Sequence, residues 1–600
     1  MPSKIVIALL SFALPFAVHI TSVREASAAG SFETSNVGIP NILVSTPVVH
    51  RAGTVGMFGT ETCVPDGSYE TNRSESHLAV DPTNPSHMLG SSKFFFSAID
   101  PFSFSATHGQ DVDWSGEYQF HNGFYDLLDE APNGTDLIPG YTCVDPIPVK
   151  GKTAFYQSTT DPVMAFDTQG NAYAFQLAFN YTDGTNGVYV SKRDPSGAWG
   201  PPVEVQALGT SGLGRGHEFD KQWIAVDTTA GPFQDTIYVI YVDFSTQNGR
   251  INFARSTDHG ATFSKKVTLS TTAGNGGAHG QLPQIGVDSR SFVYAVWNGN
   301  FQGNFKGQGS LLVAVSEDGG DTWQGPFDAV DFSAEGVDTP STFDGRIIQN
   351  TTFREGIPYF FTVDPQGTHV YAVEEHWSNP DTTQPGHLDV LINRGTYDSV
   401  TKTMTWEKVG LVNDNTTETD SFQPVVAAHN GTVVAAWYDR RLPCGTDASY
   451  YIQPGATNYC INTGVQFYEE TATGLQKVGT NVRASATTWD PQQPGDWFTK
   501  GVGNLPHSQF GSCFSPGVQG QICVTFIGDY FGLALANDKA YILNVSTAPQ
   551  FNPTRTIRPA DRSWRNATAG AVQEQEETAQ GVTNFYQQQV LQIVPKPNTP

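Results

Sequence analysis

Short apolar runs separated by turn residues dominate this chain. Three of them cover residues 236–242 (TIYVIYV), 292–297 (FVYAVW) and 432–438 (TVVAAWY), and all are rich in β-branched and aromatic side chains. Runs of this length and composition, bounded by turn residues, predict β-strands. Helical periodicity is sustained in one candidate segment, the Gln- and Glu-rich residues 571–589. The pattern therefore predicts an all-β protein.

The strands recur in a repeating unit that opens with a polar or proline-containing corner and continues as a short apolar strand, often ending in aspartate. The clearest openings are residues 75–81 (ESHLAVD), 161–167 (DPVMAFD), 221–227 (KQWIAVD), 281–288 (QLPQIGVD) and 422–428 (FQPVVAA), with looser ones at 359–364 and 528–534. The openings at 221 and 281 are 60 residues apart, and repeats of this length are typical of the four-stranded blades of a β-propeller. We expect six blades, with seven as the alternative. A β-sandwich and a parallel β-helix are the competing folds, but the long units with hairpin turns argue against the β-helix.

The N-terminus has the pattern of a secretory signal. Lys4 precedes an apolar run over residues 5–18, and Ala26-Ser27-Ala28 offers a small-residue cleavage site. The run is shorter than the ~20 residues that a membrane span needs, so cleavage is favoured over a single N-terminal anchor. We therefore expect a signal peptide over 1–28, an N-terminal extension or closing strand over 29–70, the propeller over 71–548 and a C-terminal tail over 549–600. The predicted location is extracellular, without a membrane span after removal of the signal.

Charge and cysteine content narrow the function further. The net charge is −26 with 33 Lys and Arg residues, which argues against a nucleic-acid partner because no basic surface is available to neutralise phosphates. Six cysteines suit an oxidising compartment. Local pairing predicts Cys444–Cys460 and Cys513–Cys523, which leaves Cys63 with Cys143, although spacing alone does not fix the connectivity.

Cofactor and modification sites have weaker signals. No metal-binding motif is present and no cofactor is predicted, although the acidic turns around 111–113 and 414–420 are candidates for structural calcium. Asn-x-Ser/Thr sequons, which are glycosylation acceptors in a eukaryotic host, begin at Asn72, Asn133, Asn180, Asn350, Asn415, Asn430, Asn544 and Asn566.

Two predicted hairpin turns share one pattern, S-x-D-x-G-x-T-[F/W]. Its defining residues are Ser256, Asp258, Gly260 and Phe263 in one copy, and Ser316, Asp318, Gly320 and Trp323 in the other. The aspartate can accept backbone N–H groups across the turn, the glycine supplies a backbone angle that other residues resist, and the aromatic ring folds back onto the sheet. Residues 191–199 form a stretched third copy. We interpret these Asp-box turns as structural.

These turns, together with DKQWIAVD (220–227), AWYDRR (436–441) and GDYFGLA (528–534), resemble the sialidase-like, Asp-box-repeat superfamily of secreted propellers over residues 70–545. The resemblance implies a glycosidase of exo-α-sialidase type, with a tyrosine nucleophile assisted by a glutamate, an aspartate acid/base and three arginines that hold the substrate carboxylate. By chain order, the implied catalytic residues are Tyr530, Glu375 (or Glu374) and Asp113. The implied substrate-binding arginines are Arg73, Arg394 and Arg440.

The position of the site follows from the fold. The innermost strands of a propeller begin at one end of the central channel, so the residues that open the blades should converge there. These residues are Glu75, Asp161, Asp220, Lys221, Gln281, Gln423, Asp529 and Tyr530.

The leading hypothesis is thus a secreted sialidase-like hydrolase that releases a terminal acidic sugar from a glycan or polysaccharide. The chain lacks the Arg-Ile-Pro string of active sialidases, which leaves Arg51 as an alternative to Arg73. This departure motivates a second hypothesis, a non-catalytic propeller that binds glycans or a cell-surface partner. A polysaccharide lyase on the same fold is a third. The sequence does not indicate an oligomeric state.

Overall fold

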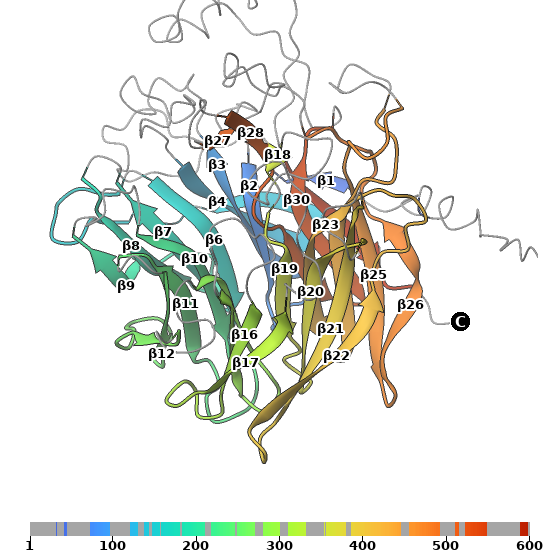
Figure 1. Cartoon of the computed structure of the whole chain (residues 1–600). Helices are drawn as coiled ribbons and strands as arrows, with labels where there is room; N and C mark the ends of the chain where they lie inside the picture. Colours follow the sequence, from blue (N-terminus) through green and yellow to red (C-terminus); the bar gives the residue numbers. More distant parts are fainter. Residues whose placement is uncertain are drawn as a thin grey trace, which may run out of the picture.

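The computed structural model of the chain is a seven-bladed β-propeller. It describes residues 32, 41–44, 73–95, 120–129, 137–142, 144, 147–156, 158–180, 183–209, 218–245, 249–270, 280–299, 310–331, 353–354, 356–379, 386–445, 455–491, 511–514, 522–548 and 588–597. These residues form seven four-stranded antiparallel sheets and one three-stranded sheet (Figure 1). The alternative blade number, seven, is the one observed, and the propeller implied by the resemblance is confirmed.

Six blades are built from four consecutive strands each. The first three are β2 (Arg73–Val80), β3 (His87–Phe95), β4 (Phe120–Asp129) and β5 (Leu137–Thr142); β6 (Ser158–Phe166), β7 (Ala172–Phe179), β8 (Asn186–Arg193) and β9 (Val203–Leu208); and β10 (Phe219–Val226), β11 (Ile237–Asp243), β12 (Arg250–Ser256) and β13 (Val267–Thr268). The next three are β14 (Gln281–Val287), β15 (Val293–Gly299), β16 (Ser310–Ser316) and β17 (Gln324–Asp331); β19 (Tyr359–Val363), β20 (His369–Trp377), β21 (Leu388–Asp398) and β22 (Thr403–Leu411); and β23 (Ser421–His429), β24 (Thr432–Asp439), β25 (Asn462–Thr471) and β26 (Gly474–Arg483).

The seventh blade joins the two ends of the chain. It comprises β29 (Gly532–Ala536), β30 (Lys539–Ser546), β31 (Gln588–Pro595) and β1 (Asn41–Leu43), and β1 pairs with β31 so that Asn41 lies opposite Gln592. The expectation that 549–600 forms only a tail is corrected by β31, which is a buried strand. The predicted helix over 571–589 is likewise wrong at Gln588 and Gln589, which begin this strand; residues 571–587 lie outside the described part of the chain.

The first strands of the blades, β2, β6, β10, β14, β19, β23 and β29, surround the central channel in that order, and β29 contacts β2 to close the ring. The second strands, β11 and β15 among them, are buried on both faces, because each blade packs against two others. All seven residues of β11 and of β15 are buried. The largest buried side chains include Trp297, Trp377 and Trp437, and burying an apolar side chain of this kind contributes about 1.5–3 kcal/mol.

The same β-bulge interrupts the first strand of five blades. At its centre lies a non-glycine residue in the left-handed region, with φ of 51° at Glu75, 51° at Asp161, 46° at Lys221, 54° at Leu282 and 49° at Gln423. The register of each strand with its neighbour shifts at this residue. Because Leu282 adopts the same conformation, the bulge is a feature of the blade and does not require a polar side chain.

The Asp-box turns have the hydrogen bonds expected of them. In the first turn, Asp258 Oδ1 accepts from the backbone N–H of Thr262 at 2.9 Å, and the Gly260 N–H donates to Ser256 Oγ at 2.9 Å. In the second, the equivalent distances at Asp318 and Ser316 are 2.8 and 2.7 Å. Phe263 and Trp323 pack against the main core. These hydrogen bonds hold the turns that begin at Ser256 and Ser316, the last residues of the third strands β12 and β16.

A three-stranded sheet lies at the other end of the molecule (Figure 1). It consists of β18 (Phe353–Arg354), β28 (Ile522–Phe526) and β27 (Gly511–Phe514), with β18 parallel to β28. Because β18 leads into β19 and β28 leads into β29, this sheet lies at the end where the first strands begin. Cys513 is directly opposite Cys523 in its register.

One predicted disulfide, Cys444–Cys460, is confirmed, with the two Cα atoms 5.3 Å apart. Cys63 and Cys143 lie outside the described residues. Within the described part of the chain, no helix is long and apolar enough to cross a membrane.

Candidate functional site

The bulges bring charged side chains from four blades together in the channel. Lys221 Nζ lies 2.9 Å from Glu75 Oε1, 2.8 Å from Asp161 Oδ2 and 2.6 Å from Asp529 Oδ2. Glu75, Asp161 and Lys221 are bulge residues of β2, β6 and β10, and Asp529 precedes β29. The structure thus unites four of the blade-opening residues expected at this end of the channel.

A second lysine, which the blade-opening pattern does not predict, completes the group. Lys93 Nζ contacts Glu75 Oε2 and lies 3.4 Å from Asp161 Oδ1. Lys93 belongs to β3, the second strand of its blade, so its position along the chain did not mark it as a channel residue. We call Glu75, Lys93, Asp161, Lys221 and Asp529 the channel cluster.

The charges of the channel cluster are nearly balanced. Burial, and then the charge of Asp161, raises the pKa of Glu75, so this carboxyl group holds its proton near neutral pH. Burial would also raise the pKa of Asp161, but Lys221 and Lys93 outweigh it and hold the pKa well below its ordinary value. The carboxylates outweigh burial in turn and raise the pKa of Lys221. The cluster has three carboxyl groups for two lysines, and Glu75 is the carboxyl group whose pKa is raised.

Tyr530 borders the channel cluster. Its ring meets the edge of Trp223 with the ring centres 5.5 Å apart, and Lys221 Nζ lies 5.8 Å from its ring centre. The hydroxyl is buried and has no hydrogen-bond partner among the described residues. Burial, followed by the charges of Asp161 and Glu75, raises the pKa of Tyr530 well above its ordinary value. The phenol is therefore neutral and is a donor without an acceptor.

Trp223 connects Tyr530 to two further rings. Its ring also packs edge to face against His77 and Phe360, at 5.1 and 5.4 Å between ring centres. Burial lowers the pKa of His77 to about 3, so this imidazole is neutral and its Nδ1 accepts the N–H of Met164 at 3.2 Å. Trp223 and the three rings around it thus form an aromatic group beside the channel cluster.

Glu375 contacts Gln423, whereas the resemblance implied that it assists Tyr530. Its Oε1 accepts the backbone N–H of Gln423 at 2.6 Å, and burial raises its pKa to about 8. The charged groups that act on Tyr530 are instead Asp161, Glu75, Lys221 and Asp529. Glu374, next along β20, accepts from Asn393 Nδ2 at 2.7 Å. The carboxyl groups beside Tyr530 are therefore those of the channel cluster.

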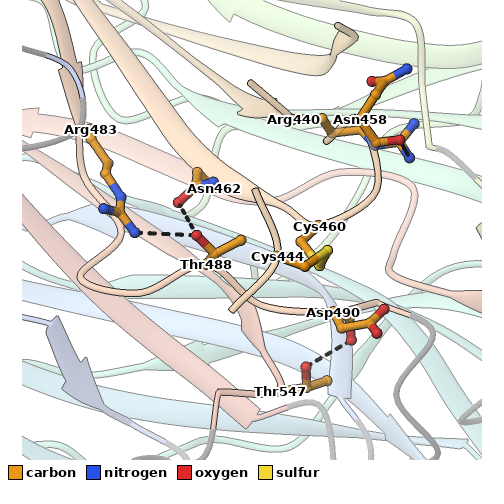
Figure 2. Close-up of a disulfide and its surroundings, with 9 residues drawn as sticks. All are labelled: Arg440, Cys444, Asn458, Cys460, Asn462, Arg483, Thr488, Asp490 and Thr547. Carbon is orange, nitrogen blue, oxygen red and sulfur yellow. Dashed lines mark hydrogen bonds between the residues drawn. A yellow bond between two sulfur atoms is a disulfide. The ribbon is translucent and has the colours of Figure 1, made fainter. Parts of the chain in front are cut away.

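Two of the three predicted substrate-binding arginines bind carboxylates of the protein. Arg440 is fully buried, donates to Asp420 Oδ2 at 2.9 Å and to the Asn458 carbonyl, and lies near the Cys444–Cys460 disulfide (Figure 2). Burial lowers its pKa to about 10. Arg394, on the third strand of its blade, pairs with Glu407 and Glu470, each at 2.9 Å. The structure does not bring these two guanidinium groups to Tyr530.

Three further predictions concern Arg73, Asp113 and the calcium turn. Arg73 begins β2, where its backbone pairs with Phe94, two residues before Glu75. Asp113, proposed as the acid/base, lies outside the described residues. In the predicted calcium turn at 414–420, Asp414 pairs with Arg441 at 2.6 Å and Asp420 with Arg440. Among the described residues, no group of three or more His, Cys, Asp or Glu side chains could hold a metal ion.

Comparison with known proteins gives a likeness at the level of solved structures alone. No protein-family model and no curated protein matches the sequence. Similar solved structures include the intramolecular trans-sialidase of Ruminococcus gnavus, at 11% identity and a TM-score of 0.37 over 61% of this chain and 89% of that one. A Trypanosoma rangeli sialidase matches at 11% identity and a TM-score of 0.35, over 67% and 58% of the two chains. An α-L-arabinofuranosidase of Fusarium graminearum matches at 11% identity and a TM-score of 0.33, over 76% and 97%. These values say nothing about the substrate of this chain.

Proposed function

We propose that this chain is a secreted propeller glycoside hydrolase that uses Tyr530 as its nucleophile. The observation that carries the proposal is the buried Tyr530 hydroxyl, which has no partner among the described residues and borders a cluster of five ionisable side chains. The bulge alone does not require charges here, as Leu282 demonstrates. Burying ion pairs is also seldom the most stable option, because similarly shaped apolar residues serve as well or better. Perturbed buried charges of this kind cluster at functional sites.

The channel cluster supplies groups in both protonation states. When the Tyr530 oxygen attacks the anomeric carbon, the glycosidic carbon–oxygen bond breaks, the phenolic proton passes to Asp161, and the leaving oxygen takes a proton from Glu75. Water then attacks the anomeric carbon, leaves its OH on the sugar and gives its other proton to Glu75, while the tyrosyl–sugar bond breaks and Asp161 returns its proton to the Tyr530 oxygen. The roles follow from the opposite pKa shifts of the two carboxyl groups. Asp113 remains a predicted alternative for the acid.

The proposed substrate is a glycan with a terminal acidic sugar. Arg73 is the candidate for binding the sugar carboxylate, because its backbone lies at the start of β2, two residues before Glu75. A guanidinium group can bind a carboxylate through two parallel hydrogen bonds. Secretion is part of the proposal, and the Cys444–Cys460 disulfide supports it because such bonds persist in oxidising compartments.

The test is release of a fluorogenic aglycone from a panel of acidic glycosides, sialosides first, by purified protein. Tyr530→Phe removes one oxygen and should lower kcat about 10³-fold or more. Tyr468→Phe is the matched control, since the Tyr468 hydroxyl is also buried without a partner among the described residues, but lies in β25. Equal activity of the Tyr530→Phe variant and the wild type, or no release from any glycoside, would contradict the proposal.

A second candidate is a non-catalytic propeller that binds glycans or a cell-surface partner. It is favoured by the burial of the channel cluster, whose most exposed side chain, Lys221, is 9% exposed, and by the pairing of each of its charges within the cluster. Glycan-array binding without turnover would support this candidate.

A further inference from the structure

Gln423 connects three segments of the chain around Tyr530. Its side-chain Oε1 accepts the N–H of Gly356 at 3.1 Å, and its Nε2 donates to the carbonyl of Gly528, also at 3.1 Å. Gly356 lies before β19 and Gly528 lies two residues before Tyr530. One amide side chain, on a bulge in β23, therefore ties the segment that carries Tyr530 to the neighbouring blade.

The segment that carries Tyr530 packs closely against Gly356 and Ile357. The N–H of Ile357 donates to the carbonyl of Asp529 at 2.6 Å. A Cβ atom added to Gly356 would lie 2.3 Å from the Asp529 carbonyl oxygen and 2.6 Å from Gln423 Cδ, which excludes any larger residue. Displacing Gln423 would thus leave the Ile357–Asp529 hydrogen bond in place but remove the hydrogen bond to Gly528, which holds the backbone before Tyr530.

Glu375 fixes Gln423 in turn. Its carboxyl group accepts the Gln423 N–H at 2.6 Å, and its own N–H donates to the Pro358 carbonyl at 2.7 Å. The Gln423 N–H belongs to a residue with φ of 49°, and a buried backbone donor without a partner costs about 1–3 kcal/mol. Glu375 therefore holds the strained bulge in the conformation that directs the amide of Gln423 at Gly528.

We propose that Glu375 and Gln423 form a clamp that positions Tyr530, and that Glu375 acts in it as a hydrogen-bond acceptor and not as the base of the nucleophile. The inference rests on the proposed function, because it assigns the glutamate of the predicted Tyr/Glu pair to a positioning role. A glutamine at position 375 offers the same acceptor oxygen but cannot take a proton. The two roles therefore predict different outcomes for one substitution.

The kinetic experiment compares variants on the glycoside that the wild type hydrolyses. Glu375→Gln should keep kcat within about threefold, whereas Glu375→Leu should lower kcat about 10²-fold with KM nearly unchanged, as expected for a misplaced reacting group. Gln423→Leu should resemble Glu375→Leu, and its backbone is tolerated because Leu282 occupies the same bulge in β14. Glu374→Gln is the matched control, since Glu374 binds Asn393 instead. A loss in Glu375→Gln as large as in Glu375→Leu would overturn the inference.

Hydrogen exchange tests the clamp without any substrate. Amide exchange in the peptide covering residues 527–531, followed by mass spectrometry, should become at least tenfold faster in Gln423→Leu and Glu375→Leu. It should stay at the wild-type rate in Glu375→Gln and Glu374→Gln. Unchanged exchange in both leucine variants would overturn the clamp. If the wild type hydrolyses no glycoside, the proposed function fails while this measurement still decides whether the clamp exists.

Discussion

Replacing Lys221 by methionine tests the electrostatic account of the channel cluster. The ammonium group lies within 2.9 Å of three carboxylate oxygens, one each from Glu75, Asp161 and Asp529. After the substitution only Lys93 remains to oppose them. Removing one partner of a buried ion pair destabilises a protein by about 3–5 kcal/mol, because the other charge stays buried. We expect at least this loss in the free energy of unfolding at pH 8.

The loss should depend on pH in a defined direction. Without the ammonium group, the folded-state pKa values of the three carboxyl groups rise above their unfolded values. A raised carboxyl pKa means that stability is present at low pH and declines as the pH rises from the unfolded value, near 4, through the folded value. In the wild type, Asp161 has a lowered pKa and contributes stability above its unfolded value. The difference between the two proteins should therefore grow from about pH 4 to pH 8.

The assay is denaturant unfolding followed by intrinsic fluorescence across this pH range. Lys150→Met is the control, because Lys150 pairs with Glu204 at the surface, where such pairs contribute about 0–1 kcal/mol. Adding Asp529→Asn to Lys221→Met should recover part of the stability, since it removes one unpaired charge. Lys221→Met should leave the backbone of the bulge unchanged, because apolar Leu282 occupies the equivalent bulge in β14. Equal stability of Lys221→Met and wild type at every pH would refute the account.

Two further predictions concern parts of the blades away from the channel. His87 lies 2.9 Å from Asp126 Oδ1 and 3.1 Å from Asp81 Oδ2, and the hydrogen bond to Asp126 raises its pKa. The stability that protonated His87 contributes is complete below about pH 6.5 and is lost as the pH rises through the raised pKa. His87→Asn should therefore flatten the decline of the unfolding midpoint over this pH range, and an unchanged slope would contradict this. Asp258→Ala removes the acceptor for the N–H and the hydroxyl of Thr262, both exposed. At about 0.5–1.5 kcal/mol for each hydrogen bond, it should lower the unfolding free energy by about 1–3 kcal/mol without changing activity. Asp321→Ala, at an exposed ion pair with Arg255, should change it by less than about 1 kcal/mol.

The sequence predicted the blades well because each one repeats a local pattern. An apolar first strand ending in aspartate recurs, and its aspartate binds the following turn, as Asp167 Oδ1 does with the N–H groups of Gln169 and Asn171, both at 2.9 Å. The strand β31 was missed for the opposite reason. Gln588 and Gln589 follow a Gln- and Glu-rich segment, and their strand conformation depends on pairing with β30 and β1, which are distant in sequence. Local composition cannot encode such a pairing.

The candidate site was likewise predictable where it follows the blade repeat and not where it depends on contacts between distant residues. Glu75, Asp161 and Lys221 were expected in the channel because they open blades, and the shared bulge places them there. Lys93 could not be found in this way, since it reaches the channel from a second strand. The family order of residue types assigned Arg440 to the substrate, but its environment, with Asp420 and Asn458, is set by a loop near a disulfide. Chain order does not determine which charges meet in space.

The distribution of polar residues around the channel argues for a site over a simple plug. Blades one, two, three and seven contribute the charges of the channel cluster. The fourth blade contributes Leu282 at the same bulge, and the fifth contributes Phe360, which packs on Trp223. A channel that only had to be filled could use apolar side chains in every blade, since Leu282 shows that the bulge accepts one, and buried charges bring no advantage in stability. The rings of Trp223 and Tyr530 lie directly beside these charges, an arrangement that suits a sugar because it has polar hydroxyl groups and an apolar ring face.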